Sequence, residues 1–369
     1  MRWVSIDEIP ENSLVAKSVY TSSGSMLLKE ATPISEKVIR ALRNQDILSI
    51  YITDALTESI KEEMNLDDAF DLKDVIDPKL RRKFNQDLIG GISTFKKSKG
   101  LSTFSSEGEN LINRVTEMSK IIVSELMLRK DRQITLVDVK HLDIYDYEHA
   151  VNTAILSVIV GLNLGLSEKE LMYLAQGSLL MNISNELLDP LITNKSETYS
   201  ETDRNIIRSH PELSRQLLND NTQANAFVKN IVLKHHERMN GSGYPNKLKA
   251  PDIDKYTKIV MIADVYDAMT SDRRHRRAHT PSETLEYIMG PSNLFDHESA
   301  FAFSRAIIPY PPGDLVELSD GSIALVLSTN DLMPLRPIVR VLIGINRNDV
   351  IDLKMRYNVV IKKRVVSVE

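Results

Sequence analysis

Apolar residues recur every three or four positions from Leu111 to Ile308, and this spacing constrains the fold more than any other feature of the sequence. Residues at such spacing lie on one face of an α-helix. The first run reaches from Leu111 to Leu126 and predicts a long helix over 108–130. Later runs predict further helices that pack around the same core. The sequence therefore favours a helical bundle.

Different patterns flank the predicted bundle. After the Pro-Tyr-Pro-Pro-Gly turn at 309–313, apolar residues alternate with polar ones, which predicts a small β module. Short apolar stretches near the start predict a β-rich unit with one helix, Ser35 to Arg43. We expect an α+β chain, mainly α, in four segments: an N-terminal β-rich domain (1–57), a helical connector (58–140), a helical domain (141–310) and a C-terminal β module (311–369).

The composition excludes several classes of function. Lys and Arg number 46 against 51 Asp and Glu, and this net charge of -5 argues against a DNA or RNA binder held by bulk charge. The chain has no Cys, which excludes disulfides, thiolate zinc sites and cysteine nucleophiles. No window of the sequence holds about 20 apolar residues, so the sequence predicts no membrane span. We therefore expect a cytoplasmic protein.

The sharpest chemical signal is the adjacent pair His235-His236. The pair follows Ile231 and Val232 of an apolar run, so both imidazoles are expected at a helix end, pointing toward one buried space. The sequence that follows, Arg-Met-Asn-Gly-Ser-Gly-Tyr-Pro at 238–245, contains two glycines and a proline, which favour a tight loop. A contact that caps the helix is the alternative role for the pair.

With these residues the chain resembles the HD-GYP family, a branch of the HD-domain metal-dependent phosphohydrolases whose known members hydrolyse the bacterial messenger cyclic di-GMP. The resemblance implies that segment 141–310 is an HD-type helical bundle, that the β module belongs to it, and that the chain takes part in cyclic di-GMP signalling. The motifs that carry it lie at 145–152, 164–167, 209–211, 235–237, 241–245, 263–273 and 309–313.

The resemblance also implies a metal site. Family members bind two cations through a histidine, a His-Asp pair, a further histidine, a His-His pair and a late aspartate. A carboxylate that bridges the cations lets them share a hydroxide and hold a phosphodiester for in-line attack. The matching positions in this sequence are His149, His210, His235, His236 and Asp264.

The sequence departs from the family at the His-Asp pair, where it has Met181-Asn182, and at a later lysine, where it has Asn185. A thioether and a neutral amide do not replace an imidazole and a bridging carboxylate. The first metal position would keep only His149 and Asp264, whereas the second would keep its three histidines. We expect no intact dinuclear centre, and either no cofactor or one divalent transition metal (Fe, Mn or Zn) per chain. No residue is assigned as catalytic.

The side of the pocket that faces the nucleotide departs less from the family. Arg273 and Arg276 match positions that present basic side chains to the phosphates of cyclic di-GMP, and arginine binds phosphate through paired hydrogen bonds. Tyr244 would stack on a guanine or contact a protein partner. The alternatives are a solvated basic turn for the arginines and a loop-bracing role for the tyrosine. Asp267 is expected to accept structural hydrogen bonds rather than to bind metal.

Three functions remain open from the sequence. The leading hypothesis is a degenerate HD-GYP-like protein without hydrolytic activity, acting as a receptor for cyclic di-GMP or a related nucleotide, or as a docking module for a signalling protein at the Gly241–Pro245 loop. The second is a residual metal-dependent cyclic di-GMP phosphodiesterase with a mononuclear three-histidine site. The third is a regulatory scaffold with a vestigial pocket, in which the long helix over 108–130 forms a homodimer.

Overall fold

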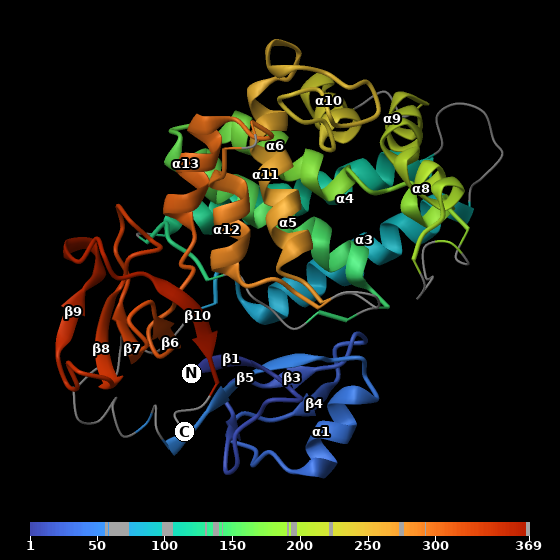
Figure 1. The fold of residues 1–369 in the computed structure, drawn as a ribbon. Helices are drawn as coiled ribbons and strands as arrows, with labels where there is room; N and C mark the ends of the chain where they lie inside the picture. Colours follow the sequence, from blue (N-terminus) through green and yellow to red (C-terminus); the bar gives the residue numbers. More distant parts are fainter. Residues whose placement is uncertain are drawn as a thin grey trace.

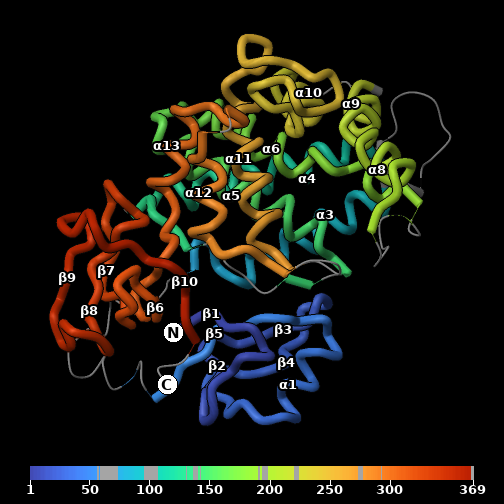
Figure 2. Tube along the Cα trace, viewed as in Figure 1, coloured from blue at the N-terminus to red at the C-terminus, as the bar shows by residue number. Residues whose placement is uncertain are grey.

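The computed structural model has a helical body and two smaller β-rich units (Figure 1). In Figure 2 the blue N-terminal unit lies beside the red C-terminal strands, below the green to orange helices. The predicted fold class, a mainly helical α+β chain, is confirmed. The structure describes residues 1–55, 58, 74–97, 106–129, 131–135, 140–141, 143–189, 192, 198–220, 224–272, 277–291 and 293–366.

Residues 1–54 form two small sheets and one helix, which agrees with the predicted β-rich unit with one helix. One sheet has the strand order β1-β5-β2, and the other pairs β3 with β4. The helix α1 begins directly after its N-cap residue, Ser35. Val15, Leu42 and Ile50 belong to the buried core of the unit. The element bounds are β1 Arg2–Ser5, β2 Leu14–Val15, β3 Val19–Tyr20, β4 Met26–Leu28, α1 Glu36–Arg43 and β5 Ser49–Thr53.

The helical body is built around α5, whose residues from Tyr147 to Leu162 are all buried. This helix packs against α6 and α11. In the part of the chain that the structure describes, no helix is long and apolar enough to cross a membrane. The helices are α3 Pro78–Lys97, α4 Ser106–Leu128, α5 Tyr145–Asn163, α6 Glu168–Leu180, α8 Glu201–Arg208, α9 His210–Asp220, α10 Ala226–Lys234, α11 Lys255–Met269, α12 Pro281–Met289 and α13 His297–Ala306, with short 3-10 helices at Asn185–Leu187 and Ala250–Asp252.

The two helices that precede α5 share its hydrophobic core. Phe84 of α3 and Leu111 of α4 are buried in the same cluster as the apolar residues of α5. The long helix predicted over 108–130 is confirmed as α4. Because its apolar face is buried inside the body, a homodimer formed by this helix would have to use another face. The polar stretches at 59–73 and 98–105 lie outside the described residues.

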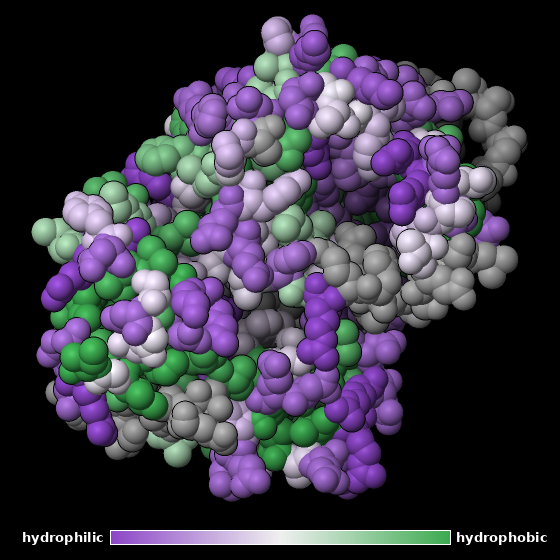
Figure 3. All heavy atoms as spheres, viewed as in Figure 1, coloured by the Kyte–Doolittle hydropathy of each residue, from purple (hydrophilic) through white to green (hydrophobic). Residues whose placement is uncertain are grey.

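The C-terminal strands form one antiparallel sheet in the order β10-β6-β7-β8-β9, which confirms the predicted β module. The sheet has a core of its own that includes Val316 and Val339. Some apolar side chains of this module are exposed, among them Ile345 and Tyr357, and Figure 3 shows apolar side chains in green gathered over it. The bounds are β6 Leu315–Leu318, β7 Ile323–Ser328, β8 Ile338–Ile343, β9 Val350–Asp352 and β10 Ile361–Val365, with a 3-10 turn at Leu353–Met355.

The N-terminal unit is bonded to both other parts of the molecule. The guanidinium of Arg2 donates to the carbonyl of Val366 at 2.7 Å and also pairs with Asp54. The ring of His141, just before α5, donates to the carbonyl of Tyr20 at 2.8 Å. These contacts fix the unit against the helical body on one side and the C-terminal module on the other.

Candidate metal centre and its hydrogen-bond network

Three histidines converge at one point of the helical body. His210 is the first residue of α9, His235 is the C-cap of α10, and His236 follows it. One ring nitrogen from each histidine lies within 4.8 Å of the others. The structure therefore brings together the three-histidine set that the sequence predicted for a single metal ion.

Hydrogen bonds determine which ring nitrogens carry protons. Because a carbonyl oxygen only accepts, Nδ1 of His210 donates to Ile207 at 2.7 Å and Nδ1 of His235 donates to Val232 at 2.9 Å. The Nε2 atoms of both rings then carry lone pairs, and they lie 3.1 Å apart. Two lone pairs at this distance repel each other, and a cation bound between them would remove the repulsion. A divalent transition metal fits this arrangement, since imidazole nitrogen is a common ligand for such ions.

Burial keeps the three imidazoles neutral. Removal from water lowers the pKa of His235 to about 3, and it also lowers the pKa of His210 and of His236 below the ordinary value. Neutral imidazole is the form that binds a metal ion. The donor set therefore fits one divalent cation without prior loss of a proton.

His149, the expected remnant of the first metal position, is held by two carboxylates. Its Nε2 donates to Asp264 at 2.9 Å, and its Nδ1 donates to Asp267 at 2.7 Å. Burial opposes protonation of the ring, but the hydrogen bonds to both carboxylates outweigh it and raise the pKa of His149 to about 9. The second oxygen of Asp264 lies 3.5 Å from Nδ1 of His236. The remnant is therefore a buried ion pair beside the three histidines.

The carboxylate of Asp267 accepts further hydrogen bonds. Nδ2 of Asn152 donates to it at 2.7 Å, and Nζ of Lys140 lies 3.1 Å from both of its oxygens. Burial disfavours the charged carboxylate, but Lys140 and His149 outweigh this and lower the pKa of Asp267 to about 2. The side-chain oxygen of Asn152 in turn accepts from Arg81 of α3 at 2.7 Å. A continuous row of hydrogen bonds thus runs from α3 to His149.

Met181 and Asn182 occupy the helix end where the family has its His-Asp pair. The helix α6 ends at Leu180, and the Met181 side chain is completely buried in the hydrophobic core. The side-chain oxygen of Asn182 is buried and has no hydrogen-bond partner among the described residues. Nδ2 of Asn185 donates to Asp146 at 3.2 Å. A thioether and neutral amides provide no negative charge for a second cation, so this donor set does not fit a dinuclear centre.

A buried carboxylate fixes the loop that follows the histidine pair. Glu237 is fully buried and accepts from the backbone N–H groups of Asn246 at 2.7 Å and Leu248 at 2.9 Å. Gly243 lies so close to this segment that a Cβ atom would come within 2.4 Å of Cα of Glu237. Only glycine fits at this position, which explains the second glycine of the motif.

Tyr244 of the same loop contacts the histidine cluster. Its ring stacks on that of His236 with centroids 4.7 Å apart and planes 26° apart. The guanidinium of Arg208, at the end of α8, lies 5.7 Å from the centre of the Tyr244 ring. Arg273 and Arg276, the predicted phosphate contacts, lie outside the described residues. Arg208 is a cation beside the site that the sequence reasoning did not identify.

The sequence reasoning also missed the partners of Asp267. Asn152 carried a local signal, because it lies three positions after His149 on α5 and shares its helix face. Lys140 and Arg81 carried no such signal, since they reach this network only through tertiary packing.

Two family models match the chain. Residues 118–298 match the model described as an HD domain. Residues 315–369 match the model described as a KOW domain associated with an HD domain, and this range contains all five C-terminal strands.

Individual relatives match shorter stretches. The cyclic di-GMP phosphodiesterase PA4108 of Pseudomonas aeruginosa is 30% identical over 60% of this chain and 53% of its own length. The cyclic di-GMP phosphodiesterase PdeB of Borreliella burgdorferi is 28% identical over 54% of this chain and 52% of its own length. The solved structure of Bd1817, an HDG"Y"P protein from Bdellovibrio bacteriovorus, aligns with a TM-score of 0.46 at 15% identity, over 82% of this chain and 97% of that one. The chain thus spans about half the length of these two curated relatives.

Proposed function

Since the chain belongs to the HD-GYP branch of the HD-domain proteins, we propose that it is a receptor that binds cyclic di-GMP without hydrolysing it. The observation that carries this proposal is a buried Met181 where the family has a metal ligand, together with a complete cluster of three histidines. The names of the two curated relatives support the choice of ligand.

The residues around the cluster support binding of a phosphate and a base. When bound to the three histidines, a divalent cation would supply positive charge for a phosphate oxygen. Tyr244 presents an aromatic ring on which a guanine base would stack, and Arg208 adds positive charge beside that ring. Arg273 and Arg276 remain the predicted phosphate contacts from the sequence.

The same residues argue against hydrolysis. The route of the family needs two cations that share a hydroxide nucleophile. Met181 and Asn182 supply neither the imidazole nor the bridging carboxylate that this requires, and Asn185 supplies no cation near the phosphate. Nε2 of His149 donates a hydrogen bond to Asp264. The proposed site therefore keeps groups that bind the nucleotide and lacks those that generate a nucleophile.

Metal analysis and nucleotide titration of the purified chain test this proposal. We expect at most one transition-metal ion per chain, which His235→Ala should remove. The matched control is His297→Ala, because this histidine is exposed and lies outside the cluster. Calorimetry should detect binding of cyclic di-GMP, and chromatography should recover the nucleotide intact after incubation with manganese or iron. Two ions per chain, with turnover that His235→Ala abolishes, would refute the proposal.

The predicted phosphate contacts provide a second test. Arg273→Ala combined with Arg276→Ala should weaken cyclic di-GMP binding on the order of a hundredfold or more, because each guanidinium–phosphate contact contributes about 1.5–3 kcal/mol. If the double change has no effect while a chelator abolishes binding, the metal ion holds the phosphate by itself.

A single-metal phosphodiesterase is the second candidate. The observation that favours it is a set of three histidines, since catalytic zinc sites commonly use three protein ligands and leave one position open. This function predicts slow turnover that a chelator removes and added metal restores. If cyclic di-GMP neither binds nor reacts, the remaining function is a scaffold on which a protein partner docks at the Gly241–Pro245 loop.

A further inference from the structure

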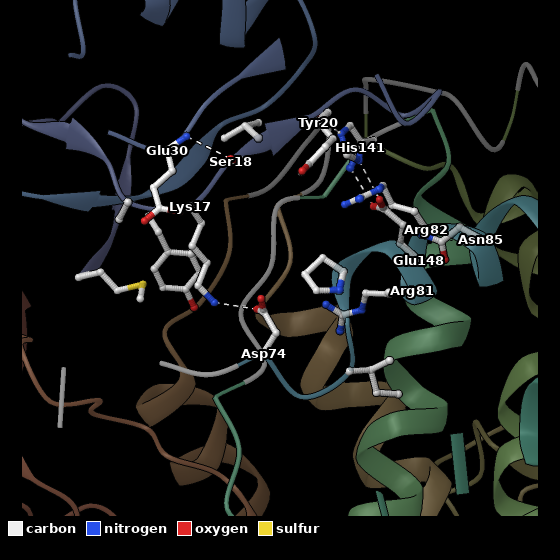
Figure 4. Close-up of a pocket in the computed structure, with 16 residues that line it drawn as sticks. Lys17, Ser18, Tyr20, Glu30, Asp74, Arg81, Arg82, Asn85, His141 and Glu148 are labelled. Carbon is white, nitrogen blue, oxygen red and sulfur yellow. Dashed lines mark hydrogen bonds and ion pairs between the residues drawn. The ribbon is translucent and has the colours of Figure 1, made fainter. Parts of the chain in front are cut away.

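A cavity of about 500 Å³ lies between the N-terminal unit and the helical body, and none of the three clustered histidines lines it (Figure 4). One wall is formed by residues 16–20 and Tyr51 of β5, and the other by the first turns of α3 and the start of α5. Small-molecule sites usually have volumes of about 300–1,000 Å³. The cavity is therefore large enough for a ligand of mononucleotide size.

Two pairs of charged side chains on the cavity wall neutralise each other. Nζ of Lys17 lies 2.7 Å from Asp74, and Nδ1 of His141 lies 2.7 Å from Glu148. The backbone N–H of His141 donates to the other oxygen of Glu148 at 2.9 Å. These four side chains are paired with one another, so they contribute little net charge toward a ligand.

Among the lining residues that the structure describes, the remaining charged side chains are two arginines and one glutamate. Arg81 and Arg82 extend from the first turns of α3. Glu30, an exposed carboxylate, belongs to the N-terminal unit. Figure 4 shows the Arg81 side chain reaching from α3 into the space beside Asp74, and the guanidinium of Arg82 lies 3.8 Å from the centre of the Tyr20 ring. Two neighbouring guanidiniums are well suited to bind a phosphate group, because each offers a planar fork of donors.

Asn85 gives an independent indication that a ligand belongs here. It lines the cavity one turn after the two arginines, and only 7% of its surface is exposed. Its side-chain oxygen has no hydrogen-bond partner among the described residues. A buried amide oxygen without a partner is unfavourable, so a ligand that donates an N–H or O–H to Asn85 would be stabilised.

We propose that this cavity binds a phosphate-bearing molecule of mononucleotide size, with its phosphate on Arg81 and Arg82 and a ribose hydroxyl or base N–H donating to Asn85. The site is separate from the one proposed for cyclic di-GMP, and it shares no residue with it. The proposal for this cavity is therefore tested independently of the proposed cyclic di-GMP receptor function.

Hydrogen bonds connect this cavity to His149, whose partner Asp264 lies 3.5 Å from Nδ1 of His236 in the cluster. Arg81 donates to Asn152 at 2.7 Å, Asn152 donates to Asp267 at 2.7 Å, and Asp267 accepts from His149 at 2.7 Å. A phosphate that binds the guanidinium of Arg81 competes with Asn152 for it, which changes the contacts of Asp267. Occupancy of the cavity thereby changes the affinity of the cluster for its metal ion, and by linkage the metal changes the affinity for the phosphate.

Calorimetric titrations with GMP, AMP and inorganic phosphate test the binding. They are made on the His235→Ala chain, so that the cavity is measured without the metal centre. At least one of the two mononucleotides should bind once per chain and more tightly than inorganic phosphate. Arg82→Ala should weaken this binding about tenfold or more, because a charge-assisted contact is lost. Lys83→Ala, which removes the same charge from an exposed neighbour on α3, should leave the affinity unchanged.

Any one of four results would refute the proposed binding site. These are no binding of either mononucleotide, equal affinity for inorganic phosphate, no effect of Arg82→Ala, and equal losses in the Arg82 and Lys83 variants. Arg82→Gln replaces Arg82→Ala if the alanine variant has a lowered melting temperature.

The connection is tested on the chain with its metal site intact. Saturating GMP or AMP should change the affinity for manganese or zinc by about fivefold or more, which is typical of coupled sites. Asn152→Ser interrupts the row of hydrogen bonds, so it should abolish this change while nucleotide binding persists. If the nucleotide does not change the metal affinity of the unmodified chain, the connection is refuted. It is also refuted if the nucleotide changes the metal affinity of the Asn152→Ser chain by the same factor.

Discussion

Acid should destabilise the metal-free protein through His235, because this histidine is buried in its neutral form. Burial lowers the pKa of His235 to about 3 in the folded chain, whereas an unperturbed histidine has a pKa of about 6.5. Above pH 6.5 the ring is neutral in both states. As the pH falls below 6.5, the unfolded chain takes up a proton that the folded chain does not, so unfolding becomes more favourable.

The size of this effect follows from the two pKa values. Each pH unit between them changes the free energy of unfolding by about 1.36 kcal/mol, so His235 should cost about 2 kcal/mol at pH 5 relative to pH 8. His149 acts in the opposite direction, because its folded pKa is raised to about 9. Its contribution is complete below pH 6.5 and is lost as the pH rises through 9. The effect of His235 must therefore be separated by substitution.

Urea denaturation in the presence of a chelator, followed by circular dichroism, provides the assay. Between pH 8 and pH 5 the unmodified chain should lose about 2 kcal/mol more than His235→Ala, by the same linkage. The cavity left by the substitution costs the same at both pH values, and His149 is present in both chains, so these terms cancel. His297→Ala should behave like the unmodified chain. Equal losses with and without His235 would contradict its burial as a neutral ring.

Three further changes have defined expected results. Gly243→Ala should destabilise the loop by more than about 1 kcal/mol in the same denaturation assay, because its Cβ would overlap the backbone of the preceding segment. His149→Ala should cost about 3–5 kcal/mol, since it leaves two buried carboxylates without their shared partner. Restoring Met181→His, Asn182→Asp and Asn185→Lys together should raise the metal content toward two ions per chain, measured by elemental analysis.

The sequence predicted those parts of the site that depend on local spacing. The helix that carries the apolar residues before His235 ends at Lys234, so the helix end and the position of the histidine pair follow from a period of 3.6 residues. The match of Met181 to the family's His-Asp pair came instead from the resemblance, and the structure places this residue directly after α6. Motifs within one helix or loop are therefore accessible from sequence alone.

The network around Asp267 could not be predicted in this way. Lys140 and Arg81 belong to segments far from it in sequence, and only tertiary packing brings them close. The ion pair of His149 with two carboxylates also depends on how α11 lies against α5. The cavity near Tyr20 is formed by the N-terminal unit and the helical body together, so no local pattern indicates it.

The attachment of the N-terminal unit at several points limits how it can transmit a signal. Arg2 bonds to Val366 on one side, and His141 bonds to Tyr20 on the other. A rotation of the unit as a whole would have to break these bonds together, whereas a change of side-chain partners at its border breaks them one at a time. A nucleotide that acts through this unit should therefore leave the radius of gyration in X-ray scattering unchanged, while hydrogen exchange slows in the first turns of α3.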